Sequence, residues 1–157
     1  MPKLTLYSLL ILSLAGYVLI GYFIERSNFE LLITTYSSLF LISYLILKNK
    51  RHYNFKVLLL SGILFRFCLI FSTPALSDDF YRFFWDGRIQ QLGFNPFDFT
   101  PRQFLNQNSD AFLNQLFPYL NSPDYFSVYP QLSQILFNIV SAIGKDSLQI
   151  NLIVMKS

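Results

Sequence analysis

The sequence predicts an all-α protein, a polytopic transmembrane helical fold. Only 13% of the 157 residues are charged, and 53% are hydrophobic, whereas a soluble domain typically carries about 25% charged residues. The mean hydropathy is +0.40, and uncharged runs rich in Leu, Ile and Phe recur along the chain. Together these observations favour helices surrounded by lipid over a soluble domain with a large core.

Uncharged segments mark the predicted spans, because about 20 apolar residues are needed to cross roughly 30 Å of hydrocarbon. The predicted spans are about 4–23, 31–47, 57–73 and 128–143, with a further helix starting in 148–157. Arg66 interrupts the third span, and it either faces the helix bundle or extends its side chain to the membrane surface. We therefore interpret residues 1–157 as one membrane domain that is truncated.

Basic residues indicate the orientation of these spans. Four of them gather in the loop 48–56, "KNKRHYNFK". This loop and the N terminus are therefore predicted to be cytoplasmic, and an outer loop of about 74–127 lies on the other side. A basic loop beside a membrane also explains the net charge of +3 without nucleic-acid binding.

The outer loop begins with "SDDFYRFFWDGR", which predicts a juxtamembrane helix over residues 77–92. Ser77 is a suitable N-cap, and Asp78 and Asp79 would lie in the first turn, where the helix dipole favours carboxylates. On a helix the charged residues share one face, while the aromatic rings lie mostly on others. The pattern predicts an amphipathic outer helix with its aromatic side in the lipid interface.

Two neighbouring carboxylates repel each other unless a cation, an arginine or a substrate hydroxyl lies between them. A carboxylate can remove the proton of an attacking hydroxyl, and an arginine fork suits a phosphate leaving group. We therefore expect base-assisted substitution here, with a lipid-borne phosphate donor. The alternative is a surface helix with simple ion pairs, in which Arg82 pairs with Asp78 or Asp86.

The strings "SDDFYRFFWDGRIQQLGFNPF" and "DYFSVYPQLSQILF" also carry a resemblance, which covers about residues 74–137. Their order and spacing resemble the first large outer loop of bacterial integral-membrane glycosyltransferases of the GT-C superfamily. The closest likeness is to the branch related to polyprenol-phosphate-mannose-dependent mannosyltransferases. The resemblance implies a hexosyltransferase that moves a sugar from a polyprenyl-phosphate donor to a glycan or lipid acceptor.

The resemblance also implies roles for individual residues. Asp78 or Asp79 would be the catalytic base or a ligand of a divalent metal ion, Mg²⁺ or Mn²⁺, with Asp78 the preferred base and Asp79 the metal or acceptor contact. The residues implied in substrate binding are Arg82, Asp86, Arg88, Asn95 and Tyr129. Within that set the arginines would hold the donor phosphate, and Asp86 would orient one of them.

By the same resemblance, the chain is an integral protein of a bacterial inner or plasma membrane. Its partners would be the bilayer, the lipid-linked donor and the acceptor, at the outer face. Relatives of this kind are longer and have a Tyr-Pro-Pro element where this chain has Tyr129, Pro130 and Gln131. We therefore expect an N-terminal portion that is inactive alone. The alternatives are a non-enzymatic polytopic membrane protein, such as a transporter or assembly subunit, and an inactive fragment.

Overall fold

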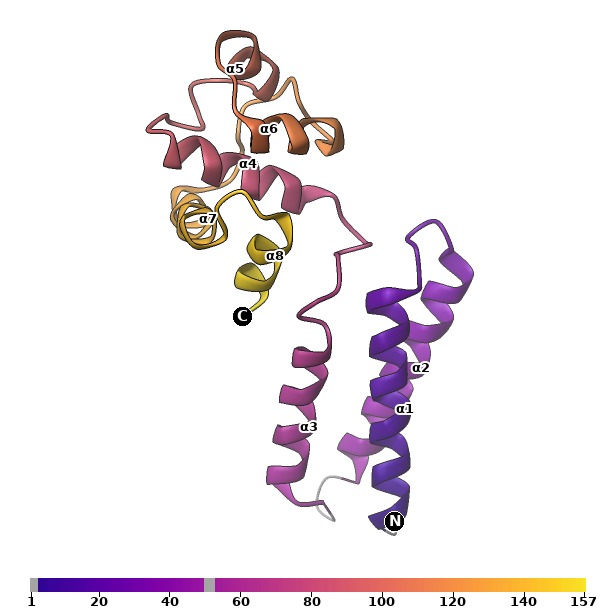
Figure 1. Ribbon diagram of the computed structural model, residues 1–157. Helices are drawn as coiled ribbons and strands as arrows, with labels where there is room; N and C mark the ends of the chain where they lie inside the picture. Colours follow the sequence, from indigo (N-terminus) through magenta and orange to yellow (C-terminus); the bar gives the residue numbers. More distant parts are fainter. Residues whose placement is uncertain (1–2, 50–52) are drawn as a thin grey trace. The chain divides into compact units, whose positions relative to one another are not determined.

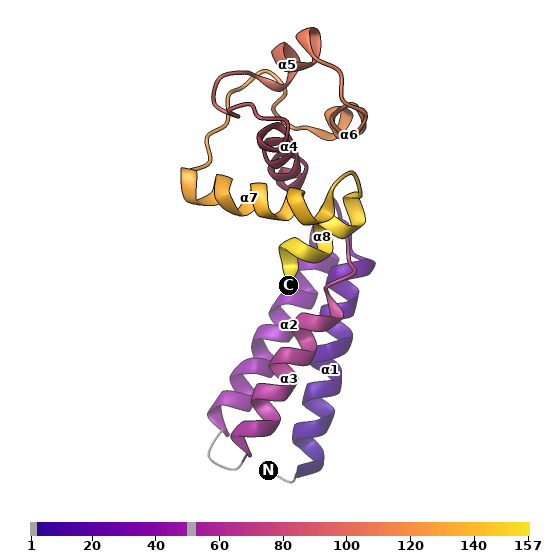
Figure 2. The same ribbon diagram turned by 60° about the vertical axis from the view of Figure 1, so that its left-hand side comes forward.

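The chain divides into two compact units, Met1–Leu76 and Ser77–Ser157, which we describe separately (Figures 1 and 2). The computed structural model describes residues 3–49 and 53–157. Within these ranges the regular elements are all helices and no strand occurs, which confirms the predicted all-α class. Lys50 and Arg51 of the predicted cytoplasmic loop lie outside the described residues.

The first unit contains three helices, α1 (Lys3–Tyr22), α2 (Phe29–Lys48) and α3 (Phe55–Cys68). Asparagine side chains begin two of them. The Asn28 side chain accepts a hydrogen bond from the backbone of α2, and the Asn54 side chain does the same for α3. Both caps satisfy backbone donors that have no partner inside the helix.

Two glycines of α1 allow its neighbours to approach closely. A Cβ atom at Gly16 would collide with Leu39 of α2, and one at Gly21 would collide with Leu69 beyond the end of α3. The absence of a side chain thus lets α1 lie against both partners, as the contacts between these helices require.

Two helices of this unit are long and apolar enough to cross a membrane, over Thr5–Tyr22 and Phe29–Lys48. They coincide with the first two predicted spans. The third, α3, has 14 residues and is therefore only about 21 Å long. Arg66 lies in the last turn of α3, where a positive charge is favourable to the helix dipole.

Three hydroxyl groups of α2 are bonded within the helix. Thr34, Thr35 and Ser38 each donate to the backbone carbonyl four residues earlier, at 2.7, 2.8 and 2.8 Å. No residue of α2 or α3 is buried. The outer surface of these helices is therefore formed by large apolar side chains and by hydroxyls that already have acceptors.

The second unit is built around α4 (Asp79–Gln91). The other elements are α5 (Pro101–Gln107), α6 (Ala111–Leu116), the 3₁₀ helix η2 (Phe117–Tyr119), α7 (Gln131–Gly144) and α8 (Leu148–Lys156). In both views α4 lies between α6 and α7, and α7 crosses α4 at a steep angle (Figures 1 and 2). The charged segment singled out in the sequence is therefore the central helix of this unit.

The crossing of α4 and α7 depends on Gly87. A Cβ atom at this position would collide with the backbone carbonyl of Phe137 and with the Ser141 hydroxyl. Because a backbone carbonyl cannot move away cheaply, only glycine fits. The glycine of the "WDGR" string thus has a packing role.

The aromatic residues of α4 form the core of this unit, and the predicted lipid-facing side is not confirmed. Phe80 is 5% exposed, and Phe84 and Trp85 are 0% exposed. Trp85 is one of the rings predicted to lie in the lipid interface, but it is packed near Phe117, with ring centroids 6.0 Å apart. The rings are covered because α6 and α7 both contact this helix.

The predicted N-cap also shifts by one residue. Asp78 is the N-cap of α4, and the Ser77 hydroxyl accepts a hydrogen bond from the Asp79 amide at 3.2 Å. Asp79 does lie in the first turn, as expected. The Asp78 side chain makes no capping hydrogen bond, so its carboxylate is not used to begin the helix.

The segment predicted as the span 128–143 forms a shorter helix than expected. Helix α7 has 14 residues, about 21 Å, against roughly 30 Å of hydrocarbon. One face of α7, including Gln134 and Phe137, is buried in the unit. The exposed apolar residues of α7 repeat at helical spacing and are Leu132, Ile135, Leu136, Ile139 and Ile143. The amphipathic helix of this unit is thus α7 rather than α4.

Candidate functional site

A buried polar network lies along the face of α4 that meets α7. Asp86 is 0% exposed and Arg82 is 4% exposed. Asp86 Oδ1 accepts from Arg82 Nε at 2.8 Å, and Asp86 Oδ2 accepts from Gln134 Nε2 at 2.8 Å and from the Ser127 hydroxyl. Three donors therefore satisfy one buried carboxylate, as burial of a charge requires. Asp86 is paired with Arg82, and its predicted part in a substrate site stays a prediction.

The guanidinium of Arg82 also anchors the loop before α7. Its Nη1 donates to the carbonyl oxygens of Ser122 at 3.2 Å and Tyr125 at 3.0 Å. These contacts bridge 40 and 43 positions in the sequence. Arg82 therefore has a structural role, and its predicted contact with a donor phosphate stays a prediction.

A cavity of about 210 Å³ opens beside this anchor. Its lining residues come from α4 and from the loop before α7, and they are Arg82, Ser122, Tyr125, Phe126, Val128 and Tyr129. Phe126 and Val128 are exposed, so the cavity has one polar wall and one apolar, open side. That combination suits a ligand with a charged head and an apolar tail.

Asp79 is connected to this cavity through Asn121. Asn121 Nδ2 donates to Asp79 Oδ1 at 2.9 Å, and the Ser122 hydroxyl donates to Asn121 Oδ1 at 3.0 Å. Burial raises the pKa of the Tyr129 hydroxyl, the negative charges of Asp79 and Asp86 raise this pKa further, and the charge of Arg82 opposes them. Four of the predicted site residues thus interact around one cavity.

The second arginine of the predicted site, Arg88, is held by other carboxylates. Its Nη2 lies 2.7 Å from Asp110 Oδ2, and its Nη1 lies 3.1 Å from Asp146 Oδ1. The hydrogen bond to Asp110 raises the pKa of Arg88, against the effect of partial burial. Arg88 therefore connects α4 to the start of α6 and to the turn before α8.

Asp110 has two functions at that contact. Its Oδ1 accepts from the Leu113 amide at 2.9 Å, which begins α6, while its Oδ2 accepts from Arg88. Burial raises the pKa of Asp110, but the hydrogen bonds from Arg88 and Leu113 outweigh burial, and the pKa is lowered overall. The cap and the ion pair thus depend on the same ionised carboxylate.

The structure does not bring Asn95 to the cavity that holds Tyr129. Asn95 Oδ1 accepts from the Phe97 amide at 3.2 Å, and its Nδ2 donates to Asp98 at 2.8 Å. It lines a different cavity, together with Gln90 and Gln134. The asparagine of "GFNPF" therefore shapes a turn, and its predicted substrate contact stays a prediction.

Sequence reasoning missed several members of the network, namely Asp110, Asn121, Ser127 and Gln134. The signal for Gln134 was present, because a glutamine within an apolar helix needs a buried partner. The others lie in loops more than 20 positions away from their α4 partners. No local pattern predicts which loop carbonyl or amide folds back onto a helix.

The residues described contain no group of three or more His, Cys, Asp or Glu side chains that could hold a metal ion. Asp78 and Asp79 supply two neighbouring carboxylates. This number fits Mg²⁺, which is commonly bound by one or two carboxylates with substrate phosphates and water. The donor set thus fits an ion that arrives with a phosphate substrate, and not a metal site formed by the protein alone.

No protein-family model matches the chain, and neither the curated proteins nor the solved structures gave a match.

Proposed function

We propose that this chain forms the donor-side part of a GT-C-like membrane glycosyltransferase. It would move a sugar from a polyprenyl-phosphate donor to a glycan or lipid acceptor at the outer membrane surface. The observation that carries the proposal is a cavity with an apolar open side that Arg82 and Tyr129 line and to which Asp79 is linked through Asn121 and Ser122. The resemblance of residues 74–137 supports the same reaction.

The reaction assigned to the site is a substitution at the anomeric carbon of the sugar. The oxygen of an acceptor hydroxyl attacks this carbon and forms the new glycosidic bond, while the bond to the donor phosphate oxygen breaks. The Asp79 carboxylate removes the hydroxyl proton, and polyprenyl phosphate leaves with the bonding electrons. The resemblance favours Asp78 as the base, but we assign this role to Asp79 because the Asn121 amide holds one of its oxygens; Asp78 remains the alternative.

A divalent ion is compatible with this assignment. Asp78, with the donor phosphate, would hold Mg²⁺ or Mn²⁺, and the ion would supply positive charge for the phosphate leaving group. The arginines near the site are already paired with carboxylates. An additional cation therefore has a clear electrostatic use at this position.

The membrane placement belongs to the same proposal. Helices α1, α2 and α3 would cross the bilayer, and α7 would lie in its surface with the exposed Leu/Ile face toward lipid. The large exposed apolar residues of α2 and α3 support this arrangement. Residues 74–127 would then lie at the outer face, at the depth of a lipid phosphate.

The test is a transfer assay in native membranes that contain the protein at its full length, with radiolabelled polyprenyl-phosphate mannose as donor. We expect Asp79→Asn to lower transfer by roughly 10²- to 10⁴-fold, the usual contribution of a general base. Glu30→Gln is the matched control, because Glu30 is also a carboxylate in the first turn of a helix. This control should retain wild-type transfer.

A second measurement separates chemistry from binding. A photoreactive polyprenyl phosphate should crosslink to the cavity of the wild-type protein and equally to that of Asp79→Asn, since the base does not hold the lipid. Wild-type transfer in both Asp78→Asn and Asp79→Asn would reject the proposed function. Non-enzymatic roles would then become the leading hypotheses.

A further inference from the structure

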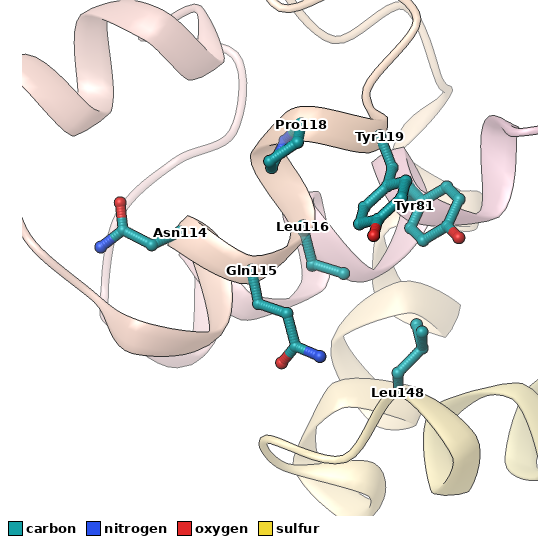
Figure 3. A pocket seen from close by; sticks show the side chains of 7 residues that line it. All are labelled: Tyr81, Asn114, Gln115, Leu116, Pro118, Tyr119 and Leu148. Carbon is teal, nitrogen blue, oxygen red and sulfur yellow. The ribbon is translucent and has the colours of Figure 1, made fainter.

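A further cavity, of about 300 Å³ and distinct from those lined by Tyr129 and by Asn95, lies in the Ser77–Ser157 unit (Figure 3). Its volume is at the lower end of the range for small-molecule sites. The lining residues come from α4, from α6 with η2, and from the start of α8. They are Tyr81, Asn114, Gln115, Leu116, Pro118, Tyr119 and Leu148.

Two tyrosine rings form one wall of this cavity. The rings of Tyr81 and Tyr119 are stacked, with centroids 4.9 Å apart and an interplanar angle of 16°, and Figure 3 shows them side by side. Tyr119 is 58% exposed. Pro118 fixes the backbone next to it in the 3₁₀ turn. The result is an aromatic surface that is held in place and still open to a ligand.

Two neighbouring amide side chains differ in direction. In Figure 3 the Gln115 side chain extends toward the Leu148 side of the cavity, while the Asn114 side chain points away from the tyrosine pair. Gln115 makes no side-chain hydrogen bond to the residues that the structure describes. One exposed amide, with two donors and an acceptor, is thus available to a ligand in this cavity.

We propose that this cavity binds a neutral sugar ring and is the acceptor subsite of the transferase. The apolar C–H face of the sugar would stack on Tyr119, because the face of an aromatic ring carries negative charge that attracts C–H groups. The Gln115 amide would bond to sugar hydroxyls. The acceptor role, though not the binding of sugar, rests on the proposed function.

The chemistry of the lining selects against other ligands. No lining residue is charged, so a phosphate, a nucleotide or a carboxylate would lose its hydration without gaining a charged partner. A purely apolar ligand would leave the Gln115 amide and the tyrosine hydroxyls without hydrogen bonds. A polyhydroxylated, uncharged molecule with an apolar face satisfies both kinds of surface.

The position of the cavity also suits an acceptor. Tyr81 follows Asp79 by two positions on α4, so this helix presents both the carboxylates and the sugar platform. Burial raises the pKa of Tyr81, as do the neighbouring Tyr119 and the negative charge of Asp78. Asp79 is thus linked through Asn121 to Ser122 of the Tyr129 cavity, while the charge of Asp78 acts on Tyr81 of the Tyr119 cavity.

The experiment is saturation-transfer NMR on the full chain in lipid nanodiscs, with methyl α-mannopyranoside as the probe. We expect binding by the wild-type protein and a roughly 3- to 10-fold weaker affinity in Tyr119→Ala, the range of one aromatic contact. Gln115→Ala should weaken binding as well. Tyr119→Phe should retain it, since the stacking face is unchanged.

Asn106→Ala is the matched control, because Asn106 of α5 is an exposed side-chain amide that does not line this cavity, and it should bind like wild type. Equal binding by Tyr119→Ala and wild type, or no binding by the wild type, would overturn the sugar site even if Asp79→Asn abolishes transfer. Tyr119-dependent binding without any transfer would instead support the sugar site and reject the proposed function.

Discussion

The two units differ in how far the residues of their helices are buried. Helix α2 has 20 residues and none of them is buried, whereas α4 has 13 residues and seven of them are buried. Helix α4 has the lower apolar content of the two, yet it is the centre of a core. Burial within the chain therefore follows from what packs on each helix, and not from its hydrophobicity.

Their polar groups differ in the same way. Three hydroxyls of α2 bond to the same helix, four positions away. Several polar groups of α4 bond instead to residues more than 20 positions away, such as Asn121 and Gln134. These α2 hydroxyls therefore find their partners within one helix, while α4 needs distant parts of the chain in place. Three predictions test this difference, and the single tryptophan, Trp85, reports on the second unit in each.

The largest effect is expected for Asp86→Ala. This change leaves the buried Arg82 guanidinium without its carboxylate, and breaking a buried pair in this way costs about 3–5 kcal/mol. Chemical unfolding of the full chain in detergent, followed by Trp85 fluorescence, should show a midpoint at much lower denaturant. Glu30→Ala removes an exposed carboxylate of the first unit and should change the free energy of unfolding by less than about 0.5 kcal/mol. A small effect of Asp86→Ala would mean that the network does not hold the second unit together.

An intermediate effect is expected for Gly87→Ala. The new methyl group would collide with the Phe137 carbonyl, and such overpacking costs about 1–3 kcal/mol. Gly62→Ala in α3 is the matched control, because nothing lies within 4 Å of a Cβ atom there. Alanine at position 62 should favour its helix by roughly 0.5–1 kcal/mol and leave the Trp85 transition unchanged. A shift of that transition in Gly62→Ala would show that the two units unfold together.

The smallest effect is expected for Asp110→Asn. Asparagine can still cap α6, but the charge-assisted bond to Arg88 is lost, which costs roughly 1–2 kcal/mol at neutral pH. Because folding lowers the pKa of Asp110, the ionised group stabilises the fold above its unfolded pKa of about 3.9. This contribution is lost as the pH falls through the lower folded value.

The stability difference between wild type and Asp110→Asn should therefore be full at pH 6 and should shrink steadily below pH 4. Unfolding midpoints from Trp85 fluorescence at several pH values measure this. A difference that does not change with pH would show that the Arg88 contact does not depend on the charge of Asp110.

The sequence predicted those features that depend on local patterns. The apolar runs gave the all-helical class and the two helices long enough to span, and the position of Asp79 in a first turn followed from the dipole preference of carboxylates. The pairing of Arg82 with Asp86 followed from their spacing of four. Each of these involves residues within one helix.

Features that depend on tertiary packing were not predictable in this way. By residue type the aromatic rings of α4 suit a lipid interface, but in the structure α6 and α7 cover them. Gln134 and Asn138 are polar residues inside the predicted span 128–143, but Gln134 donates a hydrogen bond to the buried Asp86 carboxylate. The pairing of Arg88 with Asp110 joins residues 22 positions apart. Such contacts follow from the path of the loops, which a single sequence does not specify.

The hydroxyls of α2 have a consequence for how this helix would enter a bilayer. Hydropathy scales count threonine and serine as polar groups that lose their hydrogen bonds to water on entering lipid. In α2, three such hydroxyls instead keep a hydrogen bond to a backbone carbonyl of the same helix. The true transfer free energy of the segment should then be more favourable than its composition suggests.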